Sequence, residues 1–403
     1  MKVLMINSVS GYGSTGSICV DIAGMLENQG HESYIAYGQL SSAYKNSFKI
    51  GTVLENHLHN IGSRIFGKQG YFTHGGTKKL VKFIENYNPD VIHLHNLHGN
   101  YLNLKILFDY LKEIQKPVVW TLHDCWAFTG KCAHYTDVAC YKWQTHCNNC
   151  PQVQKYPSSL FFDKSSIMFD DKREWFTSIE NMTIIPVSNW LAGEVSKSFL
   201  NKYPIVPIYN WIDFEVFKPS EKSKFNNEYG LDEIKFSIIV VSAAWHIEDV
   251  KWQDLLEFAD KIEANTQIIV IGKVDKLALL PKNCVSINYV HGKEKLAALY
   301  SFADAYIHLS TEDTFGKVIA EALSCGTPAI VYNSTACPEI IGEGCGYVVE
   351  KRNVDQVLEA INKIEINKKK FYSAKCRKHV MDHFNYTINI NQTIAVYKNR
   401  IAI

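Results

Sequence analysis

The sequence predicts an α/β protein with two doubly wound domains that face each other across a cleft. Short apolar runs alternate with amphipathic segments, the alternation restarts after the middle of the chain, and 403 residues exceed what one ordinary core accommodates. Apolar runs of this kind are typical of parallel strands that helices cover on both faces. Such sheets bind ligands at the carboxyl ends of their strands, so we expect the functional residues in the loops there.

The first half of the chain contains four strand-like runs separated by helix-like segments. The strands are predicted at Val3–Asn7, Ser33–Tyr37, Asp90–His95 and Pro117–Leu122, and the helices at about Ser17–Gln29, Lys78–Asn86 and Leu102–Ile114. The first apolar run reaches a turn by Gly11 and is too short for a secretory signal. No later segment has the roughly 20 apolar residues needed to cross a bilayer, so we expect a soluble, cytoplasmic protein.

The second half repeats the pattern after a polar stretch. Its strands are predicted at Phe236–Val241, Gln267–Ile271, Val285–Asn288, Ala305–Leu309 and Pro328–Val331, and its helices at about Trp252–Ala264, Lys293–Phe302 and Lys317–Cys325. The linker is expected at about 212–222. We therefore predict Rossmann-like domains at 1–212 and 213–380, and a C-terminal helix at 381–403 that packs back toward the first domain.

Acidic and basic residues nearly balance. The chain has 42 Lys and Arg and 41 Asp and Glu, a formal net charge of +1. No global basic field therefore favours nucleic acid as a partner, and none favours an anionic membrane surface.

A glycine-rich segment, Gly11–Gly16, lies between the first strand and the first helix. Glycines let backbone N–H groups approach an anion, so Gly13, Ser14, Thr15 and Gly16 are candidate phosphate-binding residues, and either hydroxyl could cap the helix. The spacing also fits a dinucleotide fingerprint, but the second strand ends at Tyr37-Gly38-Gln39 without the acidic residue that binds a ribose. A tight turn with a capped helix is the alternative interpretation.

Two histidine motifs follow strands of the first half. His93 and His95 alternate along one strand and share a face, so they could share a metal ion, but no third ligand is evident. A core histidine with a satisfied ring N–H is the other interpretation. His123 ends the next strand beside Asp124, where a histidine can hydrogen-bond a ligand hydroxyl or transfer a proton near neutral pH. We take His123 as functional.

The segment 310–331 places two carboxylates, Asp313 and Glu321, around a loop that turns into a helix. A helix start offers free N–H groups and the positive end of a dipole to a phosphate, while nearby carboxylates can bind hydroxyls. These are the groups needed to hold a sugar nucleotide.

The pattern Asp313-Thr-Phe-Gly316-x4-Glu321-Ala-x2-Cys-Gly326-x-Pro328 resembles the family 4 glycosyltransferases of the GT-B fold, as do Pro338-Glu339 downstream and Asn210-x-Ile-Asp213 before the second domain. The resemblance covers nearly the whole chain in the expected order. Within the family, the sequence is most similar to bacterial enzymes of colanic-acid and exopolysaccharide assembly. The resemblance implies retaining transfer from a nucleotide-sugar donor to a glycan or lipid-linked saccharide, without a catalytic metal.

The resemblance also assigns residues to the donor. Glu321 is expected to bind the ribose, Asp313 to lie at the donor sugar, and the backbone of Phe315, Gly316 and Lys317 to hold the diphosphate. The family usually has glutamate where this chain has Asp313, and Glu312 is a neighbouring candidate. The two acids would bind substrate and would not act as the acid and nucleophile of a glycosidase.

The first domain is expected to face the acceptor. His123 would orient the sugar, which makes His123, Asp313 and Glu321 the predicted catalytic set. His95, Asn96 and Asp124 are the acceptor-side candidates.

The phosphate site departs from the family pattern. The family usually follows the first strand of the second domain with an arginine and then a lysine, which hold the phosphates as a charge-assisted pair. The segment 242–253 contains His246 and Lys251 but no arginine. We expect Lys251 to take the lysine role, with Lys317 or backbone N–H groups in place of the arginine.

Four cysteines, Cys132, Cys140, Cys147 and Cys150, lie in an insertion at about 125–160. A Cys-x-x-Cys pair with two further cysteines nearby suffices for a tetrahedral zinc site, and a reducing compartment favours zinc over disulfides. The outer spacing fits no standard zinc finger, and His134 or His146 could replace one ligand. Structural zinc is the first interpretation, free thiols the second and disulfides the third.

Two other functions stay open from the sequence alone. A non-catalytic GT-B-like module that binds a nucleotide sugar or a partner protein would account for the missing arginine. A GT-B sugar-nucleotide epimerase would need no acceptor, although the Asp313 and Glu321 motif speaks against it. Acceptors in such pathways are usually lipid-linked, so the resemblance also implies peripheral attachment at the inner membrane face.

Overall fold

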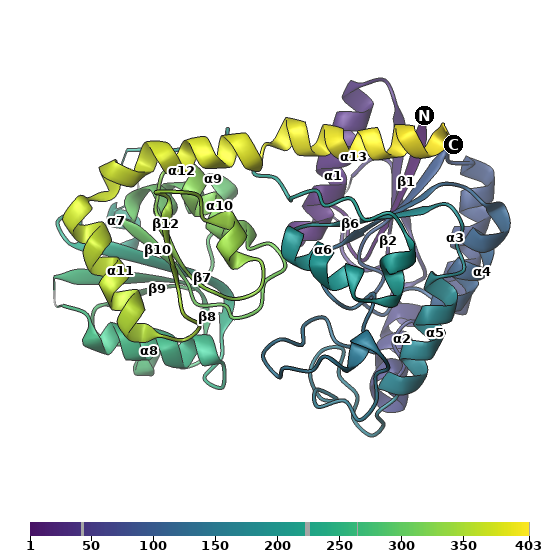
Figure 1. Ribbon diagram of the computed structural model, residues 1–403, viewed down its shortest axis with the longest axis horizontal. Helices are drawn as coiled ribbons and strands as arrows, with labels where there is room; N and C mark the ends of the chain where they lie inside the picture. Colours follow the sequence, from purple (N-terminus) through teal and green to yellow (C-terminus); the bar gives the residue numbers. More distant parts are fainter. Residues whose placement is uncertain (42–43, 222–225, 264, 403) are drawn as a thin grey trace. The chain divides into compact units, whose positions relative to one another are not determined.

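The computed structural model describes residues 1–41, 44–221, 226–263 and 265–402. Within them the chain forms two compact units (Figure 1): one runs from Met1 to Ile208 and includes the C-terminal stretch from Ile390, and the other runs from Tyr209 to Asn389. The boundaries expected from the sequence are 213 and 381. The predicted ends of the linker at 222, of one helix at 264 and of the C-terminal helix at 403 lie outside the described residues.

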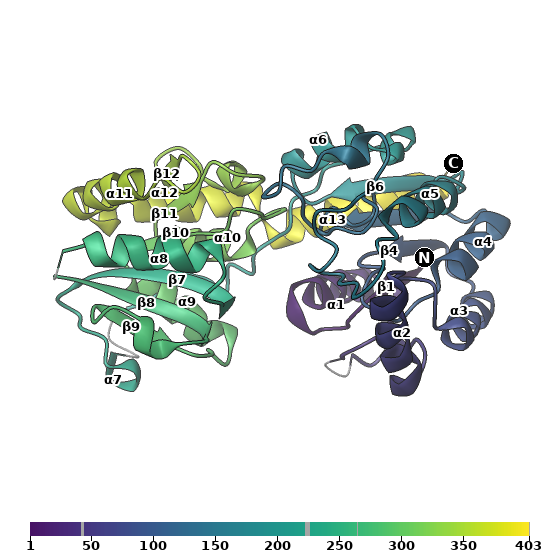
Figure 2. The ribbon, with the colours of Figure 1, turned by 90° about the horizontal axis from the view of Figure 1, so that it is seen from below.

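The first unit contains a parallel sheet in the order β3-β2-β1-β4-β5-β6. Its strands are β1 (Lys2–Asn7), β2 (Glu32–Tyr37), β3 (Ser47–Lys49), β4 (Val91–Leu94), β5 (Val118–Leu122) and β6 (Met182–Pro186). Strands β4, β5 and β6 are buried along their whole length, because helices lie against both faces of the sheet (Figure 2). The strand order reverses between β1 and β4, and doubly wound sheets bind ligands at that switch point.

The first unit contains the helices predicted from the sequence and others that were not predicted. They are α1 (Gly13–Asn28), α2 (Val53–Phe66), α3 (His74–Tyr87), α4 (Leu104–Ile114), α5 (Ser165–Phe176) and α6 (Asn189–Ser196), with the 3-10 helices η1 (Lys142–Gln144) and η2 (Phe199–Lys202). Helix α2 was not predicted, although a capping box starts it: Thr52 Oγ1 accepts the Glu55 N–H, and the Thr52 N–H donates to the Glu55 carboxylate.

The second unit repeats the topology of the first, with a parallel sheet in the order β12-β11-β10-β7-β8-β9. Its strands are β7 (Phe236–Trp245), β8 (Thr266–Val274), β9 (Cys284–Ile287), β10 (Ala305–His308), β11 (Ala329–Tyr332) and β12 (Gly346–Val349). Its helices are α7 (Asn226–Tyr229), α8 (Val250–Lys261), α9 (Lys293–Phe302), α10 (Lys317–Ser324), α11 (Val354–Asn367) and α12 (Lys369–His383), with the 3-10 helices η4 (Leu277–Leu279) and η5 (Cys337–Ile340). The switch point lies between β7 and β10.

Strand β7 continues beyond its predicted end. A register irregularity occurs between Val241 and Ala244, after which the pairing with β8 resumes as far as Trp245. Residues 242–245, which were expected to form a loop, therefore belong to β7. The strand fixes the backbone at the start of the segment 242–253, which contains Lys251.

The last helix, α13 (Tyr386–Ile401), joins the core of the first unit from Ile390 onward. Ile390, Ile394 and Tyr397 are buried, and the Tyr397 hydroxyl lies 2.5 Å from Nδ1 of His93. A side chain near the end of the chain is thus hydrogen-bonded to the central strand β4.

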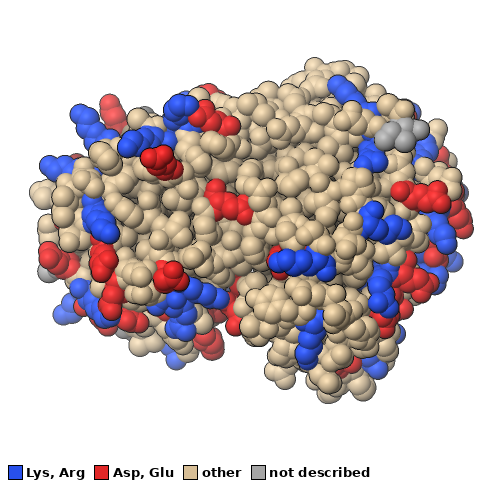
Figure 3. All heavy atoms as spheres, in the orientation of Figure 1, with Lys and Arg blue, Asp and Glu red and all other residues tan. Residues whose placement is uncertain are grey.

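The charged surface matches the balanced composition. Acidic and basic side chains are interspersed on the face shown in Figure 3, and neither sign gathers there into a broad patch. Among the described residues, no helix combines the length and the apolar character that crossing a membrane requires.

Candidate functional site

The glycine loop after β1 is closed by its own backbone. The Gly11 N–H donates to the Gly16 carbonyl at 3.0 Å, and a Cβ on Gly16 would lie 3.0 Å from the Gly11 nitrogen, so the loop requires glycine at position 16. Helix α1 begins at Gly13, one residue before Ser14; its N-cap position is Tyr12, and no side chain caps it. The expectation that Ser14 or Thr15 caps this helix is therefore wrong, and the N–H groups of the first turn are left to another partner.

Asn7 connects this loop to the next strand across the switch point. Its buried side chain donates to Thr15 Oγ1 at 3.3 Å and accepts the Asn96 N–H at 3.2 Å. The loop residue Thr15 and the acceptor-side candidate Asn96 are thereby held by one amide. Asn7 ends the first strand but was not among the site residues predicted from the sequence.

The two histidines of β4 have different partners. Both ring nitrogens of His93 are used, by Thr121 Oγ1 at 2.8 Å and by Tyr397, and burial lowers the pKa of His93 to about 3. A buried, satisfied core histidine is therefore the correct interpretation of His93. The described residues include no group spaced for a metal ion that contains His93 or His95.

His95 instead supports His123. Nδ1 of His95 lies 3.0 Å from Nε2 of His123, and the two rings are nearly parallel with centroids 5.3 Å apart. Burial lowers the pKa of His95 well below its ordinary value, with His93 and His123 adding to the effect, so His95 is neutral. The partly exposed His123 ring at the end of β5 is thus oriented by a buried neutral imidazole.

Asp124 has a partner that the sequence analysis did not assign. Its carboxylate lies 2.7 Å from Nε2 of His98 and accepts the Trp126 N–H at 2.8 Å. Burial acts to raise the pKa of Asp124, but the charge and hydrogen bond of His98 and the Trp126 N–H together lower it to about 2. His98 is also 2.7 Å from the Tyr156 hydroxyl, so the three side chains form a chain of hydrogen bonds.

Tyr156 leads from this chain into a pocket of about 1010 Å³ within the first unit. Seven of its eleven lining residues have polar side chains: Gln39, Lys49, Asn56, His57, Asn60, Asn100 and Tyr156. Amides and a phenol offer both donors and acceptors, which suits a ligand rich in hydroxyl groups. The lining residues come from four separate parts of the sequence, so the pocket could not be predicted from any one of them.

A second pocket, of about 620 Å³, opens at the switch point of the second sheet. Its lining comes from the ends of β7 and β10 and from the helices that follow: Val241, Ser242, Ala243, Trp245, Lys251, His308, Leu309, Ser310, Asp313 and Val318. Two predicted residues, Lys251 and Asp313, therefore share one cavity. No arginine belongs to this set of lining residues.

Lys251 is placed by the strand that extends beyond its predicted end. Its Nζ donates to Ser242 Oγ at 2.8 Å and lies 3.4 Å from the Asp249 carboxylate. The ammonium is partly exposed at the pocket, where it can exchange such contacts for an anion. His246 pairs with Asp275 at 2.9 Å on an exposed loop and does not line this pocket.

Asp313 is held by a buried histidine. His308 Nε2 lies 2.6 Å from the Asp313 carboxylate, and His308 Nδ1 lies 2.8 Å from the Tyr306 hydroxyl. Burial opposes protonation, but Tyr306, Asp313 and Cys337 together raise the pKa of His308 well above its ordinary value. His308, Asp313 and Cys337 also lie within the spacing of metal ligands, with the first two joined directly by their hydrogen bond.

Helix α10 begins at the edge of this pocket. Gly316 precedes it with a φ of +83°, and a Cβ there would lie 2.6 Å from Ile319 Cδ1, so the sharp entry requires glycine. The Phe315 ring is buried against Tyr209 and Phe384, which leaves its backbone for a ligand. No side chain caps α10, so the helix start keeps the free N–H groups expected of a phosphate site.

Glu321 lies one turn into α10, three residues after the pocket residue Val318 and four after Lys317. It is 8% exposed, and no group of the described residues hydrogen-bonds its carboxylate. Burial raises its pKa to about 7, while Lys317 and Lys293 act in the opposite direction. The raised pKa means that the fold disfavours the charged form of Glu321, and a ligand that donates hydrogen bonds to the carboxylate would offset this cost.

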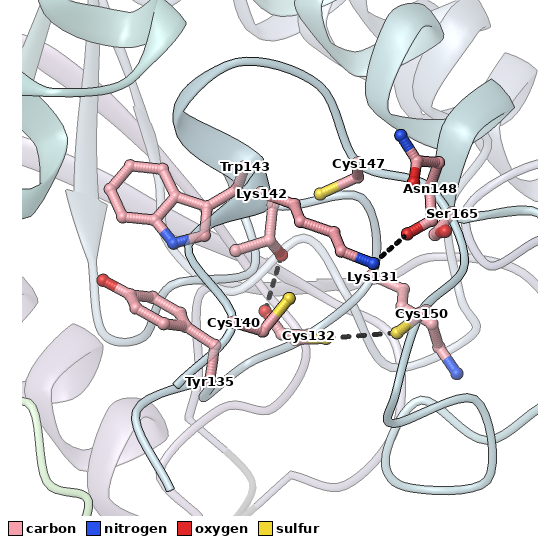
Figure 4. Close-up of a pocket in the computed structure, with 11 residues that line it drawn as sticks. Lys131, Cys132, Tyr135, Cys140, Lys142, Trp143, Cys147, Asn148, Cys150 and Ser165 are labelled. Atoms are coloured by element: carbon pink, nitrogen blue, oxygen red, sulfur yellow. Dashed lines mark hydrogen bonds between the residues drawn. The ribbon is translucent and has the colours of Figure 1, made fainter. Parts of the chain in front are cut away.

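The four cysteines line one small enclosed space in the insertion between β5 and α5 (Figure 4). Cys132 Sγ and Cys150 Sγ are 3.7 Å apart, and Cys147 Sγ accepts the Gly130 N–H at 3.3 Å. All four are free thiols in the structure. The Cys132 thiol donates to Cys150 and lowers the pKa of Cys150.

Solved structures establish the fold. Sucrose-phosphate synthase from Thermosynechococcus elongatus aligns with a TM-score of 0.72 and 14% identity over 100% of this chain and 99% of that chain. Anabaena Alr3699/HepE in complex with UDP aligns with a TM-score of 0.67 and 16% identity over 99% of this chain and 100% of that chain. The two parallel Rossmann-like sheets thus define a GT-B fold, which confirms the predicted fold class.

Sequence comparisons give the family. The description Glycosyltransferase Family 4 matches residues 15–216, and Glycosyl transferases group 1 matches residues 227–378. The Escherichia coli K12 protein WcaC, named as a glycosyl transferase of colanic acid biosynthesis, is 26% identical over 402 residues, which cover 91% of each chain. The chain belongs to glycosyltransferase family 4, and the predicted resemblance is confirmed.

Proposed function

We propose that this protein is a retaining hexosyltransferase that moves a sugar from a nucleoside diphosphate sugar to a saccharide acceptor. Glu321 is the observation that carries the proposal, because a buried carboxylate without a partner beside an uncapped helix start suits a ribose next to a diphosphate. The complex of the related Anabaena protein with UDP-glucose supports this class of donor.

The proposed donor site combines Lys251 and Asp313 of the second pocket with Lys317, the first residue of α10. Lys251, Lys317 and the N–H groups after Phe315 would hold the diphosphate, in place of the arginine that this chain lacks. Asp313, oriented by His308, would hydrogen-bond the donor sugar. In the first unit, the glycine loop from Gly13 to Gly16 would bind a phosphate through its own N–H groups.

The proposed reaction forms a bond between the anomeric carbon and an acceptor oxygen while the bond from that carbon to the diphosphate breaks. The departing diphosphate takes the acceptor proton, and attack from the side that it leaves retains the configuration. Lysines and a helix start stabilise the charge that develops on the diphosphate. His123, with its ring aligned by His95, would orient the sugar.

The polar pocket of the first unit is the proposed acceptor site. His95, Asn96 and Asp124 lie around the switch point of its sheet, and Asp124 reaches Tyr156 of the pocket through His98. The likeness to WcaC supports a glycan or lipid-linked saccharide of surface polysaccharide assembly as the acceptor.

A thermal-shift panel tests the donor assignment. UDP-, GDP-, ADP- and dTDP-sugars are compared at equal concentration, and one nucleotide class should raise Tm by several degrees, because a ligand at 100 times its Kd adds about 2.7 kcal/mol to the free energy of unfolding. The donor assignment is wrong if none of them stabilises the protein. Transfer to an acceptor then separates an enzyme from a module that only binds the nucleotide sugar, and isomerisation of the free donor would indicate an epimerase.

We also propose that the first unit docks on an anionic membrane. Helix α2 exposes Leu54, Leu58 and Ile61 on one face, and the Leu160 N–H donates to the carbonyl of Arg64 at its end, which brings the exposed Phe161 and Phe162 beside it. Arg64, Lys68 and Lys164 lie next to these apolar groups in the chain. Apolar side chains with a basic border are typical of surfaces that insert into the headgroup region.

A flotation assay tests this docking surface. The protein should float with vesicles of phosphatidylglycerol and phosphatidylethanolamine, and the double variant Leu58→Glu, Phe161→Glu should lose at least about 90% of that binding, because charge is costly at the acyl boundary. Ile234→Glu, at an exposed isoleucine of the second unit, is the matched control and should float unchanged. A parent protein that stays with the soluble fraction contradicts the proposal, as does a double variant that floats like the parent.

A further inference from the structure

The insertion between β5 and α5 is held without regular secondary structure. From His123 to Lys164 the chain forms only the short helix η1, although all of these residues are described. Segments of this length without helices or strands are uncommon in compact domains unless something else fixes them. Trp126, Phe128, Tyr135 and Trp143 are nevertheless buried within it, so the insertion has a defined conformation.

The sulfur atoms lie where such a cross-link would form. The 3.7 Å between Cys132 Sγ and Cys150 Sγ is about the separation of two thiolates on one tetrahedral zinc with Zn–S bonds of about 2.3 Å. Cys147 accepts a backbone N–H from Gly130, a contact that stabilises a thiolate ligand. Figure 4 shows Cys140 and Cys147 beside the same space as the close pair.

Two buried lysines beside the cysteines supply an independent observation. Lys131 is 4% exposed and Lys172 is 1% exposed, and neither forms an ion pair with a carboxylate within the described ranges. Their ammonium groups donate only to backbone carbonyls, Lys131 to Gln152 and Val153, and Lys172 to Trp126 and Thr129. The Lys172 Nζ also lies 3.5 Å from the centroid of the Trp126 ring, a cation–π contact. Additional negative charge nearby would stabilise both buried cations, and a zinc ion with four thiolates carries a net charge of −2.

The backbone next to two of the cysteines is also unusual. Ala139 precedes Cys140 with a φ of +46°, and Asn149 precedes Cys150 with a φ of +43°. Left-handed conformations are unfavourable for residues other than glycine and persist where the surroundings impose them. Both positions therefore indicate that the chain is constrained to present these two side chains.

We infer that Cys132, Cys140, Cys147 and Cys150 bind one structural Zn²⁺. Binding releases four thiol protons and forms four Zn–S bonds, with no redox change. In the structure no three of the four sulfurs lie within the spacing of one coordination sphere, so the ion would draw Cys140 and Cys147 toward the Cys132 and Cys150 pair. Four protein ligands leave no open position, so the ion supports the insertion and not the transfer reaction.

The test measures metal in the full-length protein. After dialysis against a weak chelator, elemental analysis should find about one zinc per chain, and X-ray absorption should show sulfur neighbours at about 2.3 Å. Cys147→Ser and Cys150→Ser should each lose the zinc. Cys284→Ser, at a partly exposed cysteine of the second unit, and Cys337→Ser, in the group with His308 and Asp313, should retain it.

Each contrary result overturns the inference. The inference is wrong if the parent protein contains no zinc, or if only Cys337→Ser loses the zinc. It is also wrong if mass spectrometry finds a disulfide between Cys132 and Cys150. If the cysteine variants do not fold, the absorption spectrum of the parent protein decides alone, because nitrogen or oxygen neighbours without sulfur would exclude this site.

Discussion

A Glu321→Gln variant is expected to be more stable than the parent protein at pH 8 without ligand, yet to lose its response to the sugar nucleotide. The Glu321 carboxylate is buried without a hydrogen-bond partner in the described residues, and burial raises its pKa to about 7. Glutamine keeps the shape and removes the buried charge, so the ligand-free fold gains stability. The same change removes an anionic acceptor for the ribose hydroxyls, so donor binding weakens.

The pH dependence of the parent protein has a defined sign. Below 4.5, the ordinary pKa, Glu321 is protonated in the folded and the unfolded chain. Between 4.5 and about 7 the folded chain keeps a proton that the unfolded chain releases, so this group lowers the free energy of unfolding as pH rises. Above that window the charged Glu321 lowers the free energy of unfolding by its full amount, at most roughly 3 kcal/mol from the difference between the two pKa values. The Glu321→Gln variant should lack this fall.

Melting curves from pH 5 to pH 8.5, with and without the best donor of the panel, measure both effects. Initial rates of transfer should fall about 10²-fold or more, because charged hydrogen bonds contribute about 1.5–3 kcal/mol each. Glu359→Gln, an exposed glutamate on α11 of the same unit, is the matched control and should change neither property. A Glu321→Gln variant that keeps its donor response and its rate would show that Glu321 does not bind the donor.

The sequence was sufficient where function depends on local pattern. Apolar runs and amphipathic segments predicted the central strands of both sheets, because buried parallel strands have a composition of their own. Gly316 and the Asp313 to Glu321 spacing predicted a helix start with acids around it, and α10 begins at Lys317. These features arise within about ten residues of sequence.

Contacts between distant segments were beyond the reach of the pattern. Tyr397 completes the hydrogen bonds of His93 from the far end of the chain, and the sequence alone left both a metal ligand and a core histidine open. His98 pairs with Asp124 and Tyr156 only because three loops meet. Helix α2 was also missed, and part of its apolar face is exposed instead of packed in the core.

Replacing His123 with alanine is expected to lower kcat about 10²-fold while the donor-induced rise in Tm stays unchanged. His123 belongs to the first unit, whereas Glu321, Lys251 and Lys317 of the proposed donor site belong to the second. Its ring is fixed by the neutral His95 at 3.0 Å, so the hydrogen bond that we propose between His123 and the sugar would be preorganised for the transition state. Its loss should therefore affect the reaction more than ground-state binding of the nucleotide.

Initial rates at saturating donor, combined with melting curves, separate these two effects. His123→Asn should recover part of the rate, because its amide restores a donor near the same position. His31→Ala is the matched control. His31 precedes β2, so it lies at the amino ends of the parallel strands, whereas His123 follows β5 at their carboxyl ends. The rate of His31→Ala should equal that of the parent protein. An unchanged kcat in His123→Ala would assign this histidine to structure alone. A lost donor response would place it in nucleotide binding, because a side chain that acts mainly in the transition state leaves the ground-state complex intact.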